Sequence, residues 1–293
     1  MSAIAAAGLG GGTKRARWRG GLFHALLLAS IGVGLVALGT LLVQIIKKGV
    51  PYVDGILLTN PPSANPDIAG ARPAILATIY LGLLLVALTV PIGVGTAIYL
   101  EEYADKNRWY NRLLEINIQN LAAVPSIVYG ILGLAFLVRG LGLGRVLLAG
   151  ALILTLLVLP TIIIAAREAI RAVPDSIRQG AYALGATQWQ VISRQVLPAA
   201  LPGIATGSIL ALSRAIGETA PLLLVGALTY VAFDPTLFGD FTALPVQIYQ
   251  WTKLSQPEFR HGLAAAAIIV LLVILLTLNA FAILLRNRYQ KKW

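Results

Sequence analysis

Residues 73–100 read PAILATIYLGLLLVALTVPIGVGTAIYL, a stretch without one charged side chain. A helix needs about 20 mostly apolar residues to cross the hydrocarbon core of a bilayer, and this stretch is longer. Comparable uncharged stretches are 20–46, 116–138, 146–166 and 261–285, and a further one near 199–220 holds only Arg214 and Glu218. The sequence therefore predicts an all-α polytopic membrane protein with six transmembrane helices.

The composition agrees with a chain that faces lipid. Hydrophobic residues make up 58% and charged residues only 12%, whereas soluble domains are about a quarter charged. The net charge of +11 is typical of basic anchors at helix ends in a membrane protein, so no nucleic acid is expected. The chain has no cysteine and its two histidines, His24 and His261, are far apart, so neither a metal nor another cofactor is expected.

The distribution of lysine and arginine predicts the orientation. With the N-terminus inside, 15 of these residues lie in inner segments, 7 lie in outer segments, and Arg214 lies within a span. Basic residues are enriched in cytoplasmic loops. Both termini are therefore expected in the cytoplasm, with the chain crossing the cell membrane several times.

These spans divide the chain. The first apolar run greatly exceeds the 7–15 residues of a signal peptide, so it is expected to remain as a membrane span. The expected parts are a basic cytoplasmic tail (1–21), a first transmembrane helix (22–46), an extracytoplasmic loop (47–72), a core of five spans (73–286) with a cytoplasmic loop (167–198), and a basic cytoplasmic tail (287–293).

The loop 167–198 carries the most local signals. Pro174 suits the first turn of a helix, and Gly185 suits a helix C-terminus with a left-handed backbone. Thr187 followed by Gln190 matches a capping box that starts another helix. The loop is therefore predicted to be two short helices that meet at Gly185, a hairpin over 176–196.

The hairpin exposes apolar side chains without a core of its own, which indicates a protein partner. These side chains are Ala181, Tyr182, Leu184 and Trp189. An amphipathic hairpin lying in the membrane interface is an alternative. A helix-turn-helix that reads DNA is disfavoured, because two spans clamp the loop.

Arg214 and Glu218 are the other informative pair. They lie four residues apart, so their side chains share one helical face. Each charge near the bilayer centre costs about 2.5–3.5 kcal/mol, and such residues usually serve a pathway or pair with one another. Arginine offers a planar set of donors that suits phosphate oxygens. A structural ion pair that fixes this helix to its neighbour is the alternative.

The hairpin resembles the inner loop of ABC importer permeases, whose motif is E-A-A, three residues, G, nine residues, I, one residue, L-P. Ala181, Gly185, Leu197 and Pro198 match it, while Gln179, Gly180 and Gln195 depart from it. The resemblance implies a type I importer permease, MetI-like in architecture. It also implies ATPase coupling through Gln179, Gly180, Ala181, Tyr182, Gly185, Trp189, Leu197 and Pro198.

Further stretches resemble phosphate-specific permeases, and in particular their A-type subunits, the PstA group. They are NLAAVPSIVYG (120–130), PIGVG (91–95) with IYLEEY (98–103), SRAIGETAP (213–221), LPVQIY (244–249) and PEF (257–259). The resemblance implies a phosphate permease subunit with Arg214 and Glu218 in the pathway. The implied partners are a second, C-type permease, a cytoplasmic ATPase dimer, an extracytoplasmic phosphate-binding protein and inorganic phosphate.

The chain is not expected to be an enzyme itself. It has no G-x-x-x-x-G-K-[ST] stretch, which is the phosphate-cradling loop of many ATPases, so ATP hydrolysis belongs to a partner chain. The alternatives within transport are a sulfate, molybdate or tungstate permease. A membrane regulator of phosphate signalling is the alternative from another class, and an intramembrane enzyme is disfavoured because no second ionisable cluster is present.

Overall fold

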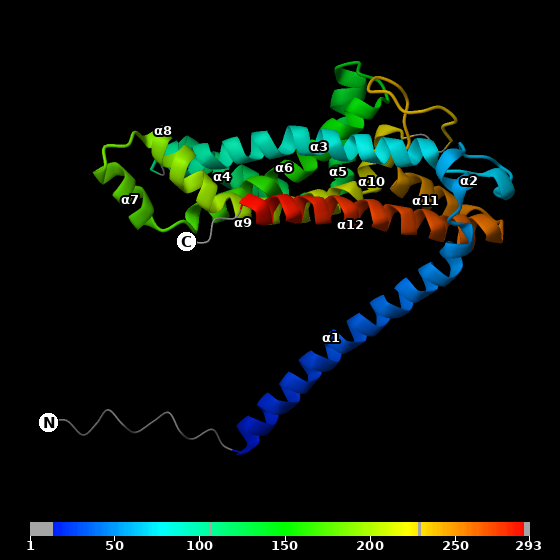
Figure 1. The fold of residues 1–293 in the computed structure, drawn as a ribbon, viewed down its shortest axis with the longest axis horizontal. Coiled ribbons are helices and arrows are strands. Elements are labelled where there is room, and N and C mark those ends of the chain that lie inside the picture. The colour runs from blue at the N-terminus through cyan, green and yellow to red at the C-terminus, as the bar shows by residue number, and fades with distance from the viewer. Residues whose placement is uncertain (1–13, 106, 228–229, 290–293) are drawn as a thin grey trace. The chain divides into compact units, whose positions relative to one another are not determined.

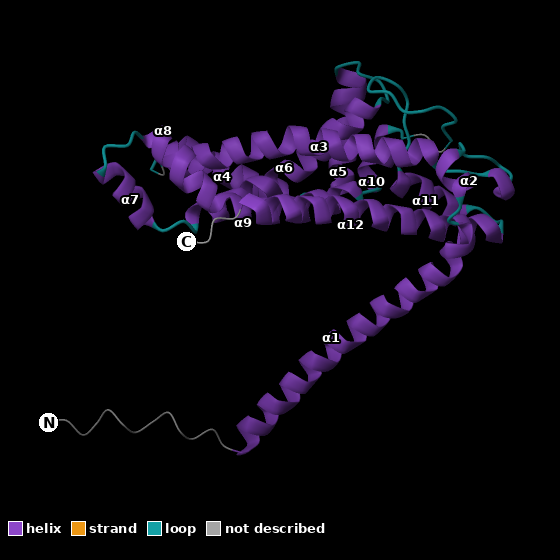
Figure 2. Ribbon diagram, viewed as in Figure 1, coloured by secondary structure: helices purple, strands orange, loops and turns teal. Residues whose placement is uncertain are grey.

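The computed structural model describes residues 14–105, 107–227 and 230–289. Within these ranges the regular elements are helices, and no named strand occurs (Figure 2). The elements are α1 (Lys14–Gly49), η1 (Val50–Tyr52), α2 (Gly55–Thr59), η2 (Pro66–Ile68), α3 (Arg72–Ile98), η3 (Tyr99–Tyr103), α4 (Trp109–Ala122), α5 (Ser126–Gly133), η4 (Leu134–Gly140), α6 (Leu147–Arg171), α7 (Asp175–Ala183), α8 (Gln188–Val191), η5 (Ile192–Val196), α9 (Leu197–Ile216), α10 (Ala220–Val225), α11 (Leu244–Lys253), η6 (Glu258–Leu263) and α12 (Ala264–Tyr289).

The chain divides into two units, residues 1–47 and residues 48–293. Helix α1 starts at Lys14, inside the stretch expected to be a tail (1–21). The remainder of that tail and the last residues of the tail 287–293 lie outside the described residues.

The second unit is built around long helices that pack side by side. Helix α6 packs against α3 and α9, and α9 also packs against α12 (Figure 1). Each of these helices is apolar along most of its length, so the contacts bury aliphatic side chains. Leu85, Leu154, Ile162 and Ala215 lie in the central cluster and are almost fully buried. The predicted all-α fold is confirmed.

Small residues let α6 and α9 approach closely. Gly203 and Gly207 of α9 face Ala169 and Ala165 of α6, four residues apart on each helix. A methyl group added to Gly203 would lie 2.8 Å from the Cβ atom of Ala169, and one added to Gly207 would lie closer still to that of Ala165. Small residues four apart are typical of tightly packed transmembrane helices.

Within the part of the chain that the structure describes, five continuous helices are long and apolar enough to span a membrane, and a bent pair brings the number to six. The bent pair is α4 with α5–η4, at an angle of 104°. The span predicted over 116–138 therefore corresponds to this bent pair. Pro125 precedes α5 with an extended backbone, and a residue before proline disfavours the helical conformation.

The second arm of the predicted hairpin is also not a separate short helix. Residues Gln188–Ile216 form one continuous helix, with the π-helical stretch η5 inside it. The N–H of Leu197 donates to the carbonyl of Ile192, five residues back. A wider turn of this kind accommodates Pro198, whose ring would crowd a regular α-helix. The hairpin therefore joins the bundle directly through its second arm.

We predict that Gly207→Ala weakens the contact between α6 and α9. The Cβ atom of Ala165 is attached directly to the backbone and has little room to move, so the helices must separate, and overpacking of this kind costs about 1–3 kcal/mol. Thermal denaturation of the detergent-solubilised protein measures the effect as a lower midpoint. Gly95→Ala in α3 is the control, because a Cβ atom there has no neighbour within 4 Å. An unchanged midpoint for Gly207→Ala would contradict the close packing.

Candidate functional site

Arg214 and Glu218 lie where α9 ends. Helix α9 stops at Ile216, Gly217 follows as its C-cap, and α10 begins at Ala220. The Nε atom of Arg214 is 3.6 Å from Oε1 of Glu218, which is an ion pair too long for a good hydrogen bond. The Arg214 side chain is 83% exposed and that of Glu218 only 20%.

This pair stays within one helix and the turn after it. Among the described residues Arg214 has no other charged or hydrogen-bonding partner, so the pair does not tie α9 to a neighbouring helix of this chain. The ion pair that the sequence left open as a structural alternative is present, and it joins α9 to the turn that follows the helix. Most N–H groups of the guanidinium remain free to bind another group.

A second helix break lies opposite the first. Residues 123–125 separate α4 from α5, and together with the end of α9 they border a cavity of about 190 Å³. The cavity is lined by Ala122, Ala123, Val124, Pro125, Ser126, Leu157, Val158, Thr161, Ala211, Arg214, Ala215 and Glu218. Its polar side chains are thus a hydroxyl from Ser126, one from Thr161, and the ion pair.

The two breaks have a common physical meaning. In hydrocarbon every backbone polar group needs a partner, so non-helical backbone at membrane depth is tolerated only inside protein or beside water. Ala123 and Val124 donate to carbonyls three residues back, as do Gly217 and Glu218. These bonds keep the N–H groups satisfied while the cavity opens between the breaks.

The hairpin forms with the predicted local geometry. Gly185 has φ +80°, the left-handed conformation expected from the sequence. Both hydrogen bonds of the capping box between Thr187 and Gln190 are present. Pro174 was predicted to lie in the first turn of a helix. In the structure it is the N-cap of α7 and so directly precedes that first turn.

The predicted coupling residues separate into two groups. Leu184 is 89% exposed, Trp189 61% and Tyr182 46%, and Gln179, Gly180 and Gly185 are also exposed. Ala181 is half-buried against the bundle. Leu197 and Pro198 lie in the long second arm, also half-buried, and are not at the exposed tip. The tip is therefore formed by residues 179–189 alone.

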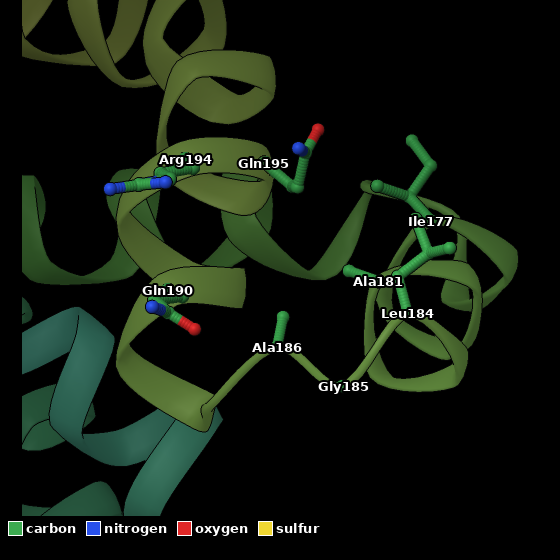
Figure 3. Close-up of a pocket in the computed structure, with 8 residues that line it drawn as sticks. All are labelled: Ile177, Ala181, Leu184, Gly185, Ala186, Gln190, Arg194 and Gln195. Carbon is green, nitrogen blue, oxygen red and sulfur yellow. The ribbon is translucent and has the colours of Figure 1, made fainter.

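A hollow of about 450 Å³ lies between the two arms. Ile177 and Ala181 lie on α7 and Leu184 is the C-cap of that helix. Gln190, Arg194 and Gln195 lie on the other arm (Figure 3). Gly185 and Ala186 form the turn that joins the arms. The hairpin is consequently open between its arms.

Sequence reasoning missed an ion-pair network beside the hairpin. Arg167 of α6 donates to Glu101 at 2.9 Å and to Glu115 of α4 at 2.6 Å. Arg171 donates to Glu101 at 2.7 Å. The side chains of Arg167 and Glu101 are 8% and 4% exposed, so the charges lie inside the protein and neutralise one another.

The network continues to α7. Arg178 donates to Oε1 of Glu102 through Nη2 at 2.8 Å and Nε at 3.2 Å. The sequence did contain a signal for these contacts. Two glutamates, Glu101 and Glu102, directly follow the uncharged stretch 73–100, and three arginines occur within residues 167–178. The pairing partners themselves could not be read from one sequence.

No group of three or more metal-ligating side chains lies among the residues that the structure describes. The charged sites are built from arginine and glutamate. At the cavity and in the network beside the hairpin, an arginine can bind an anion, and a glutamate can form an ion pair with an arginine.

Known proteins resemble the chain in sequence and in fold. Residues 89–291 match the family of binding-protein-dependent transport system inner membrane components. The phosphate transport system permease protein PstA 1 of Mycobacterium tuberculosis is 32% identical over 279 residues, which cover 94% of this chain and 89% of the relative. PstA of Xylella fastidiosa is 32% identical over 245 residues, covering 83% and 85%.

Among solved structures, a chain of a bacterial alginate ABC transporter, in complex with its alginate-bound periplasmic protein, has a TM-score of 0.66. It is 19% identical, and the match covers 94% of this chain and 96% of that one. The likeness shows a shared importer-permease fold. The chain belongs to the family of binding-protein-dependent transport system inner membrane components.

Proposed function

We propose that the chain is a permease subunit of an ATP-driven phosphate importer and forms half of its translocation pathway. The observation that carries the proposal is the cavity at two facing helix breaks, with Arg214 at its edge. Relatives that share a third of their sequence over most of their length are phosphate permeases. No feature of the cavity favours sulfate, molybdate or tungstate, or a purely regulatory role.

Arg214 suits a phosphate pathway because its charge persists at every physiological pH and its donors match phosphate oxygens. Glu218 lies close enough to orient the guanidinium through their charges without occupying its outer N–H groups. The carboxylate of Glu218 can also accept a hydrogen bond from the P–OH group of hydrogen phosphate. The Ser126 hydroxyl across the cavity supplies a further hydrogen bond.

The exposure of Arg214 supports a second permease subunit as partner. A guanidinium facing lipid is costly, and charged residues in spans almost always face the interior of a bundle or a water-filled cavity. Within this chain the Arg214 side chain is 83% exposed. A C-type permease that covers this face would enclose the pathway between the two chains.

The hairpin is the proposed contact with the ATPase dimer. Leu184, Trp189 and Tyr182 form an exposed apolar tip, as expected for a protein-binding site. This assigns the hairpin end of the bundle to the cytoplasm. An even number of six spans then puts both termini on the cytoplasmic side of the membrane. The opposite end, which includes α2 and the loop 47–72, is then available to an extracytoplasmic phosphate-binding protein.

Arg214→Gln tests the pathway. We expect labelled phosphate uptake to fall roughly 10- to 100-fold, the range for a lost charge-assisted hydrogen bond, while the complex with partner subunits still assembles. The double variant Arg214→Gln with Glu218→Gln should assemble equally well and stay inactive. Uptake and complex yield are measured together in membranes that lack the native transporter.

The double variant separates the two roles of the pair. If Arg214 only neutralised Glu218, removing both charges would restore uptake, and that result would sink the pathway role. Competition by sulfate, molybdate and tungstate in the wild-type complex tests the substrate. Stronger competition by any of these anions than by phosphate would reassign it.

Gly185→Val tests the hairpin. A β-branched residue at φ +80° is strained by about 1–3 kcal/mol, so the tip should distort. We expect normal membrane insertion, weaker recovery of the ATPase with the permease, and loss of uptake. Trp189→Ala should be milder, because it removes one contact without bending the turn.

Gly142→Val is the matched control, since Gly142 also has a left-handed backbone, at φ +66°, but lies outside the hairpin. This variant should retain normal ATPase recovery. Equal ATPase loss in both glycine variants would mean that general misfolding, and not the hairpin, explains the result.

A further inference from the structure

Helix α7 has few apolar contacts that could fix its position. None of its residues is buried. Only Ile177 and Ala181 of this helix pack against the apolar cluster at this end of the bundle. Hydrophobic packing therefore leaves α7 weakly held, and its polar contacts must set where it lies.

Arg178 makes most of those polar contacts. Besides its two bonds to Glu102, it donates to the carbonyl of Val173 at 2.6 Å and to that of Ile170 at 3.0 Å. The side chains of Arg178 and Glu102 are only 16% and 8% exposed. A guanidinium presents its donors in one rigid plane, so this set of acceptors fixes both the place and the orientation of α7.

The second arm is tied to the same glutamate. Nε2 of Gln188 donates to the backbone carbonyl of Glu102 at 2.6 Å. Arg178 from the first arm and Gln188 from the second arm therefore both bind Glu102. The exposed tip lies between these two residues. Glu102 itself belongs to η3, a π-helical continuation of α3, and π-helical turns occur frequently at functional sites.

Through Glu102 a displacement of the hairpin reaches α3. That helix packs along α6 and against α9, and these two helices contribute Leu157 and Arg214 to the cavity. A rigid connection between the hairpin and α3 would thus carry movement from the tip into the helices that border the pathway.

We propose that Glu102 is a positioning residue for coupling: it fastens both arms of the hairpin to α3, so that the hairpin and α3 move as one body when the ATPase closes. The inference rests on the proposed function, since it concerns how ATPase movement enters the permease. It assigns Arg178 and Gln188 as the two attachment points.

The test compares phosphate moved per ATP hydrolysed by the full transporter in proteoliposomes. Glu102→Ala removes the carboxylate and should lower this ratio roughly five- to tenfold, within the usual range of coupling between sites, while ATP hydrolysis continues. Glu102→Gln keeps the volume and an oxygen acceptor, so it should assemble normally and lower the ratio less. If the alanine variant fails to assemble, the glutamine variant provides the measurement.

Asp175→Asn is the matched control. Asp175 also accepts a hydrogen bond from Arg178, at 3.2 Å, but it lies on α7 itself and is 85% exposed. Its loss leaves the connection to α3 intact, so the ratio should stay as in the wild type. An unchanged ratio in both Glu102 variants, or an equal fall in Asp175→Asn, would overturn the inference. A wild-type complex that moves no phosphate would instead overturn the proposed function.

Discussion

The structure depends on one constraint: a hydrocarbon interior offers no hydrogen-bond partner to the peptide backbone. The long apolar stretches therefore fold as helices, and four of them pack into the central bundle. Against this background the two breaks, at 123–125 and 217–219, stand out because both border one cavity. Irregular backbone can persist there because the breaks lie against a cavity that holds polar side chains, Arg214 among them. We propose that this cavity is part of the anion pathway.

Charge is concentrated at the end of the bundle that carries the hairpin. Glu101 joins α3 to α6, Arg167 extends this link to α4, and Glu102 connects α3 to both hairpin arms. Several of these side chains are buried, and breaking a buried ion pair typically costs about 3–5 kcal/mol. The same contacts that hold the helix ends together are therefore the ones that, in the proposed coupling, would make the hairpin a stiff attachment for the ATPase.

The features that follow from local sequence were predictable. Apolar stretches gave the helices, and the left-handed Gly185 and the capping box at Thr187 formed as expected, because each depends on a few neighbouring residues. The bend at Pro125 and the continuous helix through Pro198 were not foreseen, since a proline can break a helix or be absorbed by a π-helical turn. The pairing of Glu102 with Arg178, 76 residues apart, depends on tertiary packing that one sequence does not reveal.

The central claim is that phosphate passes between the two helix breaks, and the absence of native cysteine permits a direct measurement. Ser126→Cys places a thiol on the wall of the cavity. In the assembled transporter with cysteine-free partners, a small water-soluble thiol reagent should modify it, and phosphate should slow that reaction severalfold while a cysteine at Ser63 in the outer loop reacts at an unchanged rate. Modification of the cysteine at 126 at the same rate with and without saturating phosphate would contradict the account.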